Sequence, residues 1–193
     1  MLCGCTAICA DGTKVPVGLW LGDTENKTVV TALLADLATR GLNADGGVLV
    51  VSDGAKALAA GVAKVFGEKA VLQRCTLRKR RNVRGHLPAE LGHRADRHLA
   101  LAFLNPDPAQ GLDTAKRLAG ESRPDHPDAA TSLLEGLEDM FTVRRLGLIG
   151  TLAGTLTTTN CVESMISVAR TTMRNMATAD VQQRTGHPHR WRP

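Results

Sequence analysis

Four large aliphatic residues in a row, Val48 to Val51, are the feature that most constrains the fold of this chain. Such a run is typical of a strand whose two faces are both buried. We therefore predict a strand in the centre of a mixed or parallel sheet. The segment ends in Ser52-Asp53-Gly54, which places an acidic side chain at the carboxyl end of the strand. Open α/β sheets bind their ligands at that end.

The segments around this strand predict an α/β fold. A turn sequence at residues 11–14 separates two strand-like segments, 7–10 and 15–21, which favours a hairpin. Apolar residues at helical spacing predict one helix over residues 27–40 and another that ends at Gly67. Residues 70–73 form a further short strand. The first 75 residues therefore have the order β-β-α-β-α-β, with helices packed against one sheet.

The rest of the chain is predicted to be mostly helical. From Thr76 to about Gly150 the pattern is polar and helical, and prolines divide it into short helices. A last helix opens at Asn160, and its apolar residues recur at helical spacing. These are Val162, Met165, Ile166, Ala169, Met173 and Met176. The helical periodicity ends near Ala179, so we expect the tail to be disordered.

Two acidic residues are candidates for chemistry, and each has a structural alternative. Asp53 could hold Mg²⁺ or Mn²⁺, which prefer oxygen ligands, or it could cap the helix that follows it. Glu163 could close a capping box with Asn160. It could also be a metal ligand, because Arg170 and Arg174 follow on the same helix face and could grip phosphate. An ordinary charged surface helix has the same pattern.

The positive charge is concentrated in one short segment. The chain has 24 Lys and Arg against 19 Asp and Glu, a net charge of +5. Six basic residues and no acid lie between positions 74 and 84, and without these six the net charge is −1. They are Arg74, Arg78, Lys79, Arg80, Arg81 and Arg84. A basic patch on a neutral protein favours nucleic acid as the partner; a solvated helix face is the alternative.

Composition excludes several classes of protein. No apolar run approaches the ~20 residues that span a bilayer, so we expect no membrane segment. Aromatic residues are 3% of the chain and Tyr is absent, which argues against base-stacking platforms for RNA. The five cysteines lack the spacing of zinc ribbons, and we expect no secretory signal from the first residues. We expect a cytoplasmic protein with reduced thiols.

Five strings in order resemble the mutator-type transposases of bacterial insertion sequences. The resemblance covers roughly residues 11–174. The strings are residues 17–26 (VGLWLGDTEN), 51–58 (VSDGAKAL), 73–75 (QRC), 81–83 (RNV) and 158–166 (TTNCVESMI).

The resemblance implies a ribonuclease-H-like fold with a helical insertion, in which three acids, Asp-Asp-Glu, hold two divalent metal ions. These ions activate water or a DNA 3′-hydroxyl for attack on a phosphodiester. Asp53 matches the second acid and Glu163 the third, with Mg²⁺ or Mn²⁺ as cofactor. The basic stretch after Cys75 lies near DNA in this family. The partners implied are the insertion-sequence ends, the target DNA and further copies of the chain, at the bacterial nucleoid.

This sequence departs from the family pattern in three ways. The family's first acid lies upstream of the segment that matches residues 9–12, so we expect the first strand to be missing. Arg78 stands where the family normally has a histidine. After Asn175 the sequence no longer resembles the family and looks like translation in a shifted frame. The expected divisions are residues 1–75 and 151–176 of the catalytic domain, a helical insertion at 76–150 and a tail at 177–193.

Three hypotheses follow. The chain is a truncated and inactive remnant of an insertion-sequence transposase, because a two-metal site that lacks one of three carboxylates loses orders of magnitude in rate. Alternatively, it is a non-catalytic module that binds DNA or a transposase subunit. The third hypothesis is that it does not fold stably, because a sheet without its first strand exposes an unpaired edge.

Overall fold

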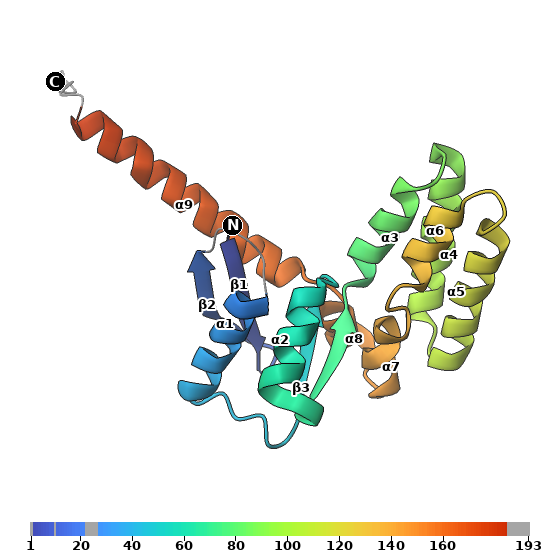
Figure 1. The fold of residues 1–193 in the computed structure, drawn as a ribbon, viewed down its shortest axis with the longest axis horizontal. Coiled ribbons are helices and arrows are strands. Elements are labelled where there is room, and N and C mark those ends of the chain that lie inside the picture. Colours follow the sequence, from blue (N-terminus) through green and yellow to red (C-terminus); the bar gives the residue numbers. More distant parts are fainter. Residues whose placement is uncertain (1, 10, 22–26, 185–193) are drawn as a thin grey trace.

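The structure is a computed structural model that describes residues 2–9, 11–21 and 27–184. It is a mixed α/β protein in which helices predominate, as the sequence predicted. Figure 1 shows the strands with helices α1 and α2 on one side of the molecule and helices α3–α6 on the other. Helix α9 starts between these two parts and extends past the strands.

The predicted hairpin is present. Strands β1 (Leu2–Ile8) and β2 (Lys14–Leu21) pair antiparallel, with an irregularity in register between Cys5 and Thr6. The turn is held by Asp11, whose two carboxylate oxygens each accept a hydrogen bond from Thr13 at 2.8 Å. Strand β1 begins earlier than the sequence pattern predicted, because its first residues pair with the far end of β2.

The predicted αβαβ segment follows the hairpin. It consists of α1 (Lys27–Thr39), β3 (Val48–Ser52), α2 (Lys56–Phe66), a 3₁₀ turn (Gly67–Lys69) and β4 (Ala70–Arg74). Strands β3 and β4 are parallel, and α2 is the crossover between them. The buried side chains of α1 and α2 form the core here: Val30, Leu34, Leu37, Val62 and Phe66.

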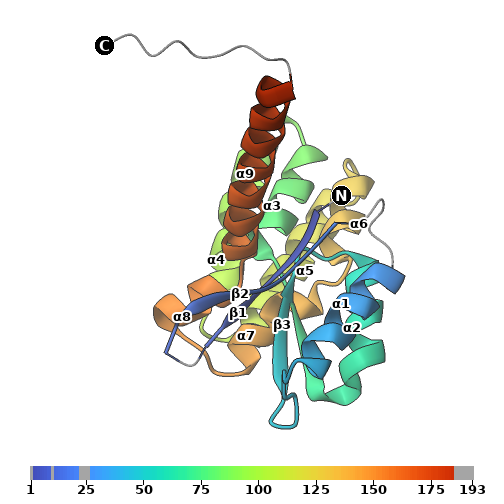
Figure 2. The ribbon, with the colours of Figure 1, turned by 90° about the vertical axis from the view of Figure 1, so that its left-hand side faces the viewer.

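The strands do not form the single sheet that we expected. In the described residues, β1 pairs with β2 and β3 pairs with β4, in two separate two-stranded sheets. Strand β3 is half-buried over residues 48–51 and not buried on both faces as we expected. Val48 and Val50 pack on the core under α1 and α2, whereas Leu49 and Val51, on the other face, belong to neither core. The two sheets nevertheless lie next to each other (Figure 2), and both contribute side chains to the core under α1 and α2.

Residues 76–156 are helical, with prolines at the starts of helices. Pro88 precedes α4, while Pro108 and Pro127 occupy the first turns of α5 and α6. The buried side chains of this helical segment form a second core, in which Phe103 and Phe141 pack edge to face with ring centroids 5.5 Å apart. The elements are α3 (Thr76–Gly85), α4 (Ala89–Leu104), α5 (Pro108–Ser122), α6 (Pro127–Leu134), a 3₁₀ turn η2 (Glu138–Phe141), α7 (Thr142–Arg145) and α8 (Gly150–Leu156).

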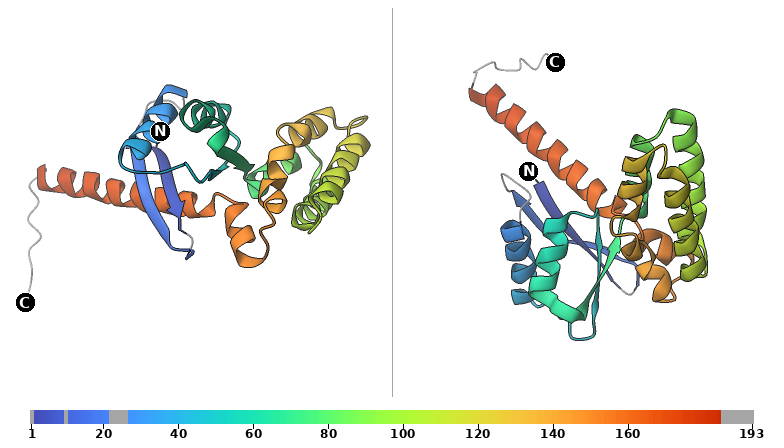
Figure 3. Two further views of the ribbon diagram at one scale, coloured as in Figure 1. Left: turned by 90° about the horizontal axis from the view of Figure 1, so that it is seen from below. Right: turned by 45° about the vertical axis from the view of Figure 1, so that its right-hand side comes forward.

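Helix α9 (Asn160–Arg184) opens at the predicted residue but continues beyond residue 176. We expected disorder from residue 177, and for residues 177–184 this was wrong. That segment contains no glycine or proline, and several of its residues favour helix, so local propensity extends the helix without apolar periodicity. The remaining expected tail, 185–193, lies outside the described residues. Near its start α9 packs on β1 (Figure 3). Met165 and Ile166 lie against Gly4 there.

Candidate functional site

Asp53 lies directly after β3, in the loop that leads into α2. The residue that caps α2 is Ala55, and its side chain makes no capping hydrogen bond. One oxygen of Asp53, Oδ1, accepts a hydrogen bond from the Ala55 backbone N–H at 3.1 Å. The local turn thus fixes the orientation of the carboxylate. The other oxygen, Oδ2, faces Arg78.

Glu163 lies in the first turn of α9. A capping box would direct its carboxylate to the backbone N–H of Asn160. The carboxylate instead accepts a hydrogen bond from the hydroxyl of Thr159 at 2.9 Å and faces Arg78. The Thr159 hydrogen bond, and then the Arg78 guanidinium, hold the pKa of Glu163 below its ordinary value, although partial burial opposes them. Glu163 is therefore ionised at neutral pH.

Arg78, on helix α3, joins the two acids. Its Nη1 lies 3.3 Å from Asp53 Oδ2, and its Nη2 lies 3.4 Å from Glu163 Oε1. All three side chains are partly exposed, between 30% and 45%. The structure therefore brings both sequence-predicted acids together, but around a guanidinium from the residue that departs from the family pattern.

Lys79 and Arg80, two of the other basic residues, are engaged within the protein. Lys79 is 4% exposed, and its ammonium donates to the carbonyls of Ser132 and Glu135 at the end of α6. Burial, and then the nearby Arg74, lower the pKa of Lys79 to about 8. Arg80 forms a two-point ion pair with Asp96, at 2.9 and 2.6 Å. The basic segment is thus not one continuous surface stripe.

Arg74 connects the sheet to the helical part of the chain. Its guanidinium donates to the carbonyls of Glu135 at 2.7 Å and Gly54 at 3.2 Å. Gly54 and Gly136 both have positive φ, and a Cβ at either position would overlap the guanidinium. Glycine is therefore needed at both positions, for conformation and for space.

Four of the sequence-predicted basic residues are exposed at the surface of two helices. Arg81 and Arg84 are exposed on α3, and Arg170 and Arg174 are exposed on α9. Arg81 contributes to the lowered pKa of Glu163, so the charge of α3 acts at the first turn of α9. From there the two helices diverge (Figure 1). These four arginines present positive charge at the surface.

Gln73 is a further important residue that the sequence analysis did not single out by itself. Its side chain is fully buried. Its amide nitrogen donates to the carbonyls of Arg74 and Met140, and its oxygen accepts from the Val143 N–H at 2.9 Å. A polar residue at the end of an apolar strand, just before a helix, was the available signal. Gln73 fixes β4 to the segment η2–α7.

The described residues hold no group of three or more His, Cys, Asp or Glu side chains that could bind a metal ion. Among the described residues, Cys5, Cys9, Cys75 and Cys161 form no disulfide. In the described part of the chain, no helix is both long and apolar enough to cross a membrane. The two acids at Arg78 therefore remain the strongest candidate site.

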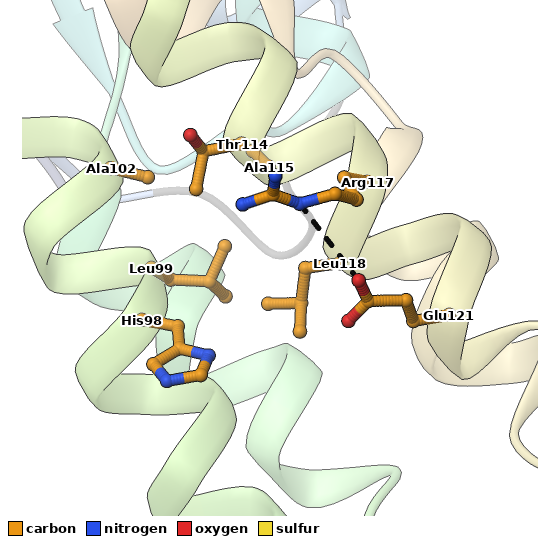
Figure 4. Close-up of a pocket in the computed structure, with 8 residues that line it drawn as sticks. All are labelled: His98, Leu99, Ala102, Thr114, Ala115, Arg117, Leu118 and Glu121. Carbon is orange, nitrogen blue, oxygen red and sulfur yellow. Dashed lines mark ion pairs between the residues drawn. The ribbon is translucent and has the colours of Figure 1, made fainter.

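A cavity of about 290 Å³ lies elsewhere, between α4 and α5. Figure 4 shows its lining: His98, Leu99 and Ala102 come from α4, and α5 supplies the rest. Arg117 and Glu121 form an ion pair at 3.8 Å within α5. None of the sequence-predicted site residues lines this cavity, so we do not assign the site to it.

A family model described as "Transposase, Mutator family" matches residues 3–178. This range includes β1–β4, the helical segment and most of α9, together with both acids and Arg78. A search of curated proteins gives no match.

Proposed function

Because this chain belongs to the mutator family of transposases, we propose that it is part of an enzyme that transposes an insertion sequence in bacteria. Transposases are DNA-processing enzymes. We assign Asp53 and Glu163 as the second and third acids of the Asp-Asp-Glu set that the resemblance implies. The observation that carries this assignment is their convergence on one side chain from β3 and α9.

The described residues do not fit a complete two-metal site. The transposase family generally uses divalent metal ions. Here two carboxylates meet, a guanidinium lies between them, and no third ligand of the usual types joins them in the described residues. We therefore derive no reaction step through a metal. We propose that this chain does not by itself cleave or join DNA.

We also propose that the two sheets belong to one ribonuclease-H-like sheet, as the resemblance implies. A further strand would have to join them, and the described residues do not supply it. Two observations support this arrangement. Cys5 and Val17 of the hairpin pack against the same core as Val48 and Val50 of β3. The order of the described strands and helices also matches the order expected from the sequence.

A nicking assay tests the proposed inactivity. Supercoiled plasmid is incubated with the chain and Mg²⁺ or Mn²⁺, with Asp53→Asn as the matched control. We expect equal background nicking from both proteins. Metal-dependent nicking by the wild type that disappears in Asp53→Asn would contradict the proposal, because it would mean that the two acids suffice for chemistry.

Non-catalytic DNA binding is the second candidate function. It is favoured by the exposed arginines of α3 and α9, namely Arg81, Arg84, Arg170 and Arg174. Exposed arginines on two helices can contact several phosphates without reading sequence. Such a module could bind DNA, or a transposase subunit on DNA, while its acid site is inactive.

Fluorescence anisotropy with a labelled duplex in a salt series tests DNA binding. We expect weak, sequence-independent binding. The logarithm of the binding constant should fall linearly with the logarithm of salt concentration. The double variant Arg81→Gln/Arg84→Gln should reduce that slope by about 2, because two phosphate contacts are lost. Arg117→Gln, on α5, is the charge control. If the salt dependence of binding were unchanged in the double variant, α3 would not contact DNA as proposed.

A further inference from the structure

Arg78 lies where a cation shared by the two acids would lie. It is the residue of α3 that faces both the end of β3 and the first turn of α9. Its two terminal nitrogens are divided between the carboxylates, Nη1 at Asp53 and Nη2 at Glu163. One delocalised charge thus serves two acids from elements far apart in the sequence.

The carboxylates are oriented toward Arg78 by contacts of their own. The Ala55 N–H holds Oδ1 of Asp53, which leaves Oδ2 directed at Nη1. The Thr159 hydroxyl bonds to Oε1 of Glu163, the same oxygen that faces Nη2. A divalent ion that needed Oδ2 and Oε1 together would have to displace the guanidinium.

The charge at the site follows from this arrangement. Two carboxylates alone would carry two negative charges and attract a divalent cation. The guanidinium cancels one of them, and an arginine keeps its charge at every pH at which the protein is folded. All three side chains are also partly exposed, so a metal ion can reach them from solvent. A metal ion is therefore kept from the two carboxylates by competition with Arg78 and not by a lack of access from solvent.

We propose that Arg78 is a built-in counter-cation that takes the place of a divalent metal ion between Asp53 and Glu163 and keeps metal affinity low. The inference rests on the assignment of these acids as the family's metal-site positions. This role of Arg78 differs from ordinary ion pairing at a surface, because an ordinary ion pair would have no effect on metal binding. Arg78 also has a second role, which is to tether α9 to the end of β3.

Manganese binding tests this proposal directly, because free Mn²⁺ has a strong electron paramagnetic resonance signal that bound Mn²⁺ loses. The wild type, Arg78→Gln and the double variant Arg78→Gln/Asp53→Asn are titrated with MnCl₂. Arg97→Gln, at an exposed position on α4, is the matched control for the loss of one positive charge. Circular dichroism first establishes that each variant is folded.

We expect Arg78→Gln to bind Mn²⁺ at least about tenfold more tightly than the wild type, because the site then carries both negative charges. The double variant should lose this binding, and Arg97→Gln should behave as the wild type. If Arg78→Gln does not fold, Arg78→Met replaces it. Methionine also removes the positive charge, so Arg78→Met should likewise bind Mn²⁺ more tightly than the wild type.

Two outcomes would overturn the proposal, and they differ in meaning. In the first, the wild type and Arg78→Gln bind Mn²⁺ with equal affinity, and the double variant loses this binding. That result would show that Arg78 does not compete with the metal ion, while the assignment of the acids would stand. No binding by any folded variant would show that Asp53 and Glu163 do not form a cation site, and the assignment would then fail too.

Discussion

Glu163 and Arg78 lie 3.4 Å apart, Oε1 to Nη2, although 85 positions in the chain separate them. The contact joins the first turn of the last helix to the first helix after β4. The same guanidinium reaches Asp53, so the contact also determines the charge at the candidate site.

Thr159→Val should raise the pKa of Glu163. The Thr159 hydroxyl is the largest contributor to the lowered pKa of this carboxyl, and valine keeps the shape while removing the donor. Carbon-13 NMR of the side-chain carboxyl measures the change. Thr155→Val, in which the lost hydroxyl bonds to a backbone carbonyl in α8, is the matched control. An unchanged pKa in Thr159→Val would contradict the geometry described for Glu163.

The same carboxyl makes stability depend on acid pH. The pKa of Glu163 is lower in the folded than in the unfolded state, so the ionised carboxylate contributes to the free energy of unfolding above about pH 4.5. This contribution is lost as the pH falls through the folded value. Glu163→Gln should therefore differ from the wild type most at neutral pH, and urea unfolding should show the difference shrinking below about pH 4.5. A difference that grows in acid would contradict this account.

Lys79 should make the protein more stable in mild alkali. Its pKa is about 8 in the folded state against 10.5 for the ordinary group, so the unfolded state binds more protons between these values. Stability should rise with pH across this window by up to about 3 kcal/mol. Urea unfolding of Lys79→Met should lack that rise, whereas Lys116→Met, an exposed lysine on α5, should retain it. Parallel pH profiles for the wild type and Lys79→Met would contradict the burial of this charge.

Gln73→Leu should be strongly destabilising although leucine has a similar size. The substitution leaves the Val143 N–H and the Met140 carbonyl without their partner in a buried place. We expect a loss of about 2–4 kcal/mol in the free energy of unfolding. Val71→Thr, at an exposed position of the same strand, should change it by less than about 0.5 kcal/mol. Similar small losses in both variants would mean that Gln73 does not connect β4 to η2–α7.

Gly136→Ala should destabilise the protein by about 1–3 kcal/mol, because the residue has positive φ and its Cβ would overlap the Arg74 guanidinium. Gly120→Ala, within α5 and with open space around it, is the matched control and should be neutral or stabilising. Thermal unfolding measures both. Tolerance of Gly136→Ala would contradict the close approach of Arg74.

The sequence predicted local structure better than it predicted how distant segments pair. The spacing of apolar residues in α1 and α2, and the prolines at the starts of α4, α5 and α6, act within a few residues, so these elements were predicted. The four aliphatic residues of β3 indicated burial but not the number of paired edges. Strand pairing joins segments far apart in the chain, which periodicity does not encode.

The candidate site was predictable only in part, because its residues come from local sequence strings but their arrangement depends on tertiary packing. Asp53 and Glu163 came from motif strings, and their meeting is consistent with the order of those strings. Arg78 was noticed as a departure, but its position between the acids depends on how α3 and α9 pack. The internal contacts of Lys79 and Arg80 likewise arise from tertiary packing, whereas the sequence showed only a run of positive charge.

Anomalous diffraction from a crystal of the chain grown in MnCl₂ tests the central claim most directly. Data collected at the manganese edge locate any bound ion at the acids. The account predicts no manganese peak between Asp53 and Glu163, with the Arg78 guanidinium in contact with both carboxylates. A manganese peak bound by the two carboxylates, with Arg78 turned away, would contradict it.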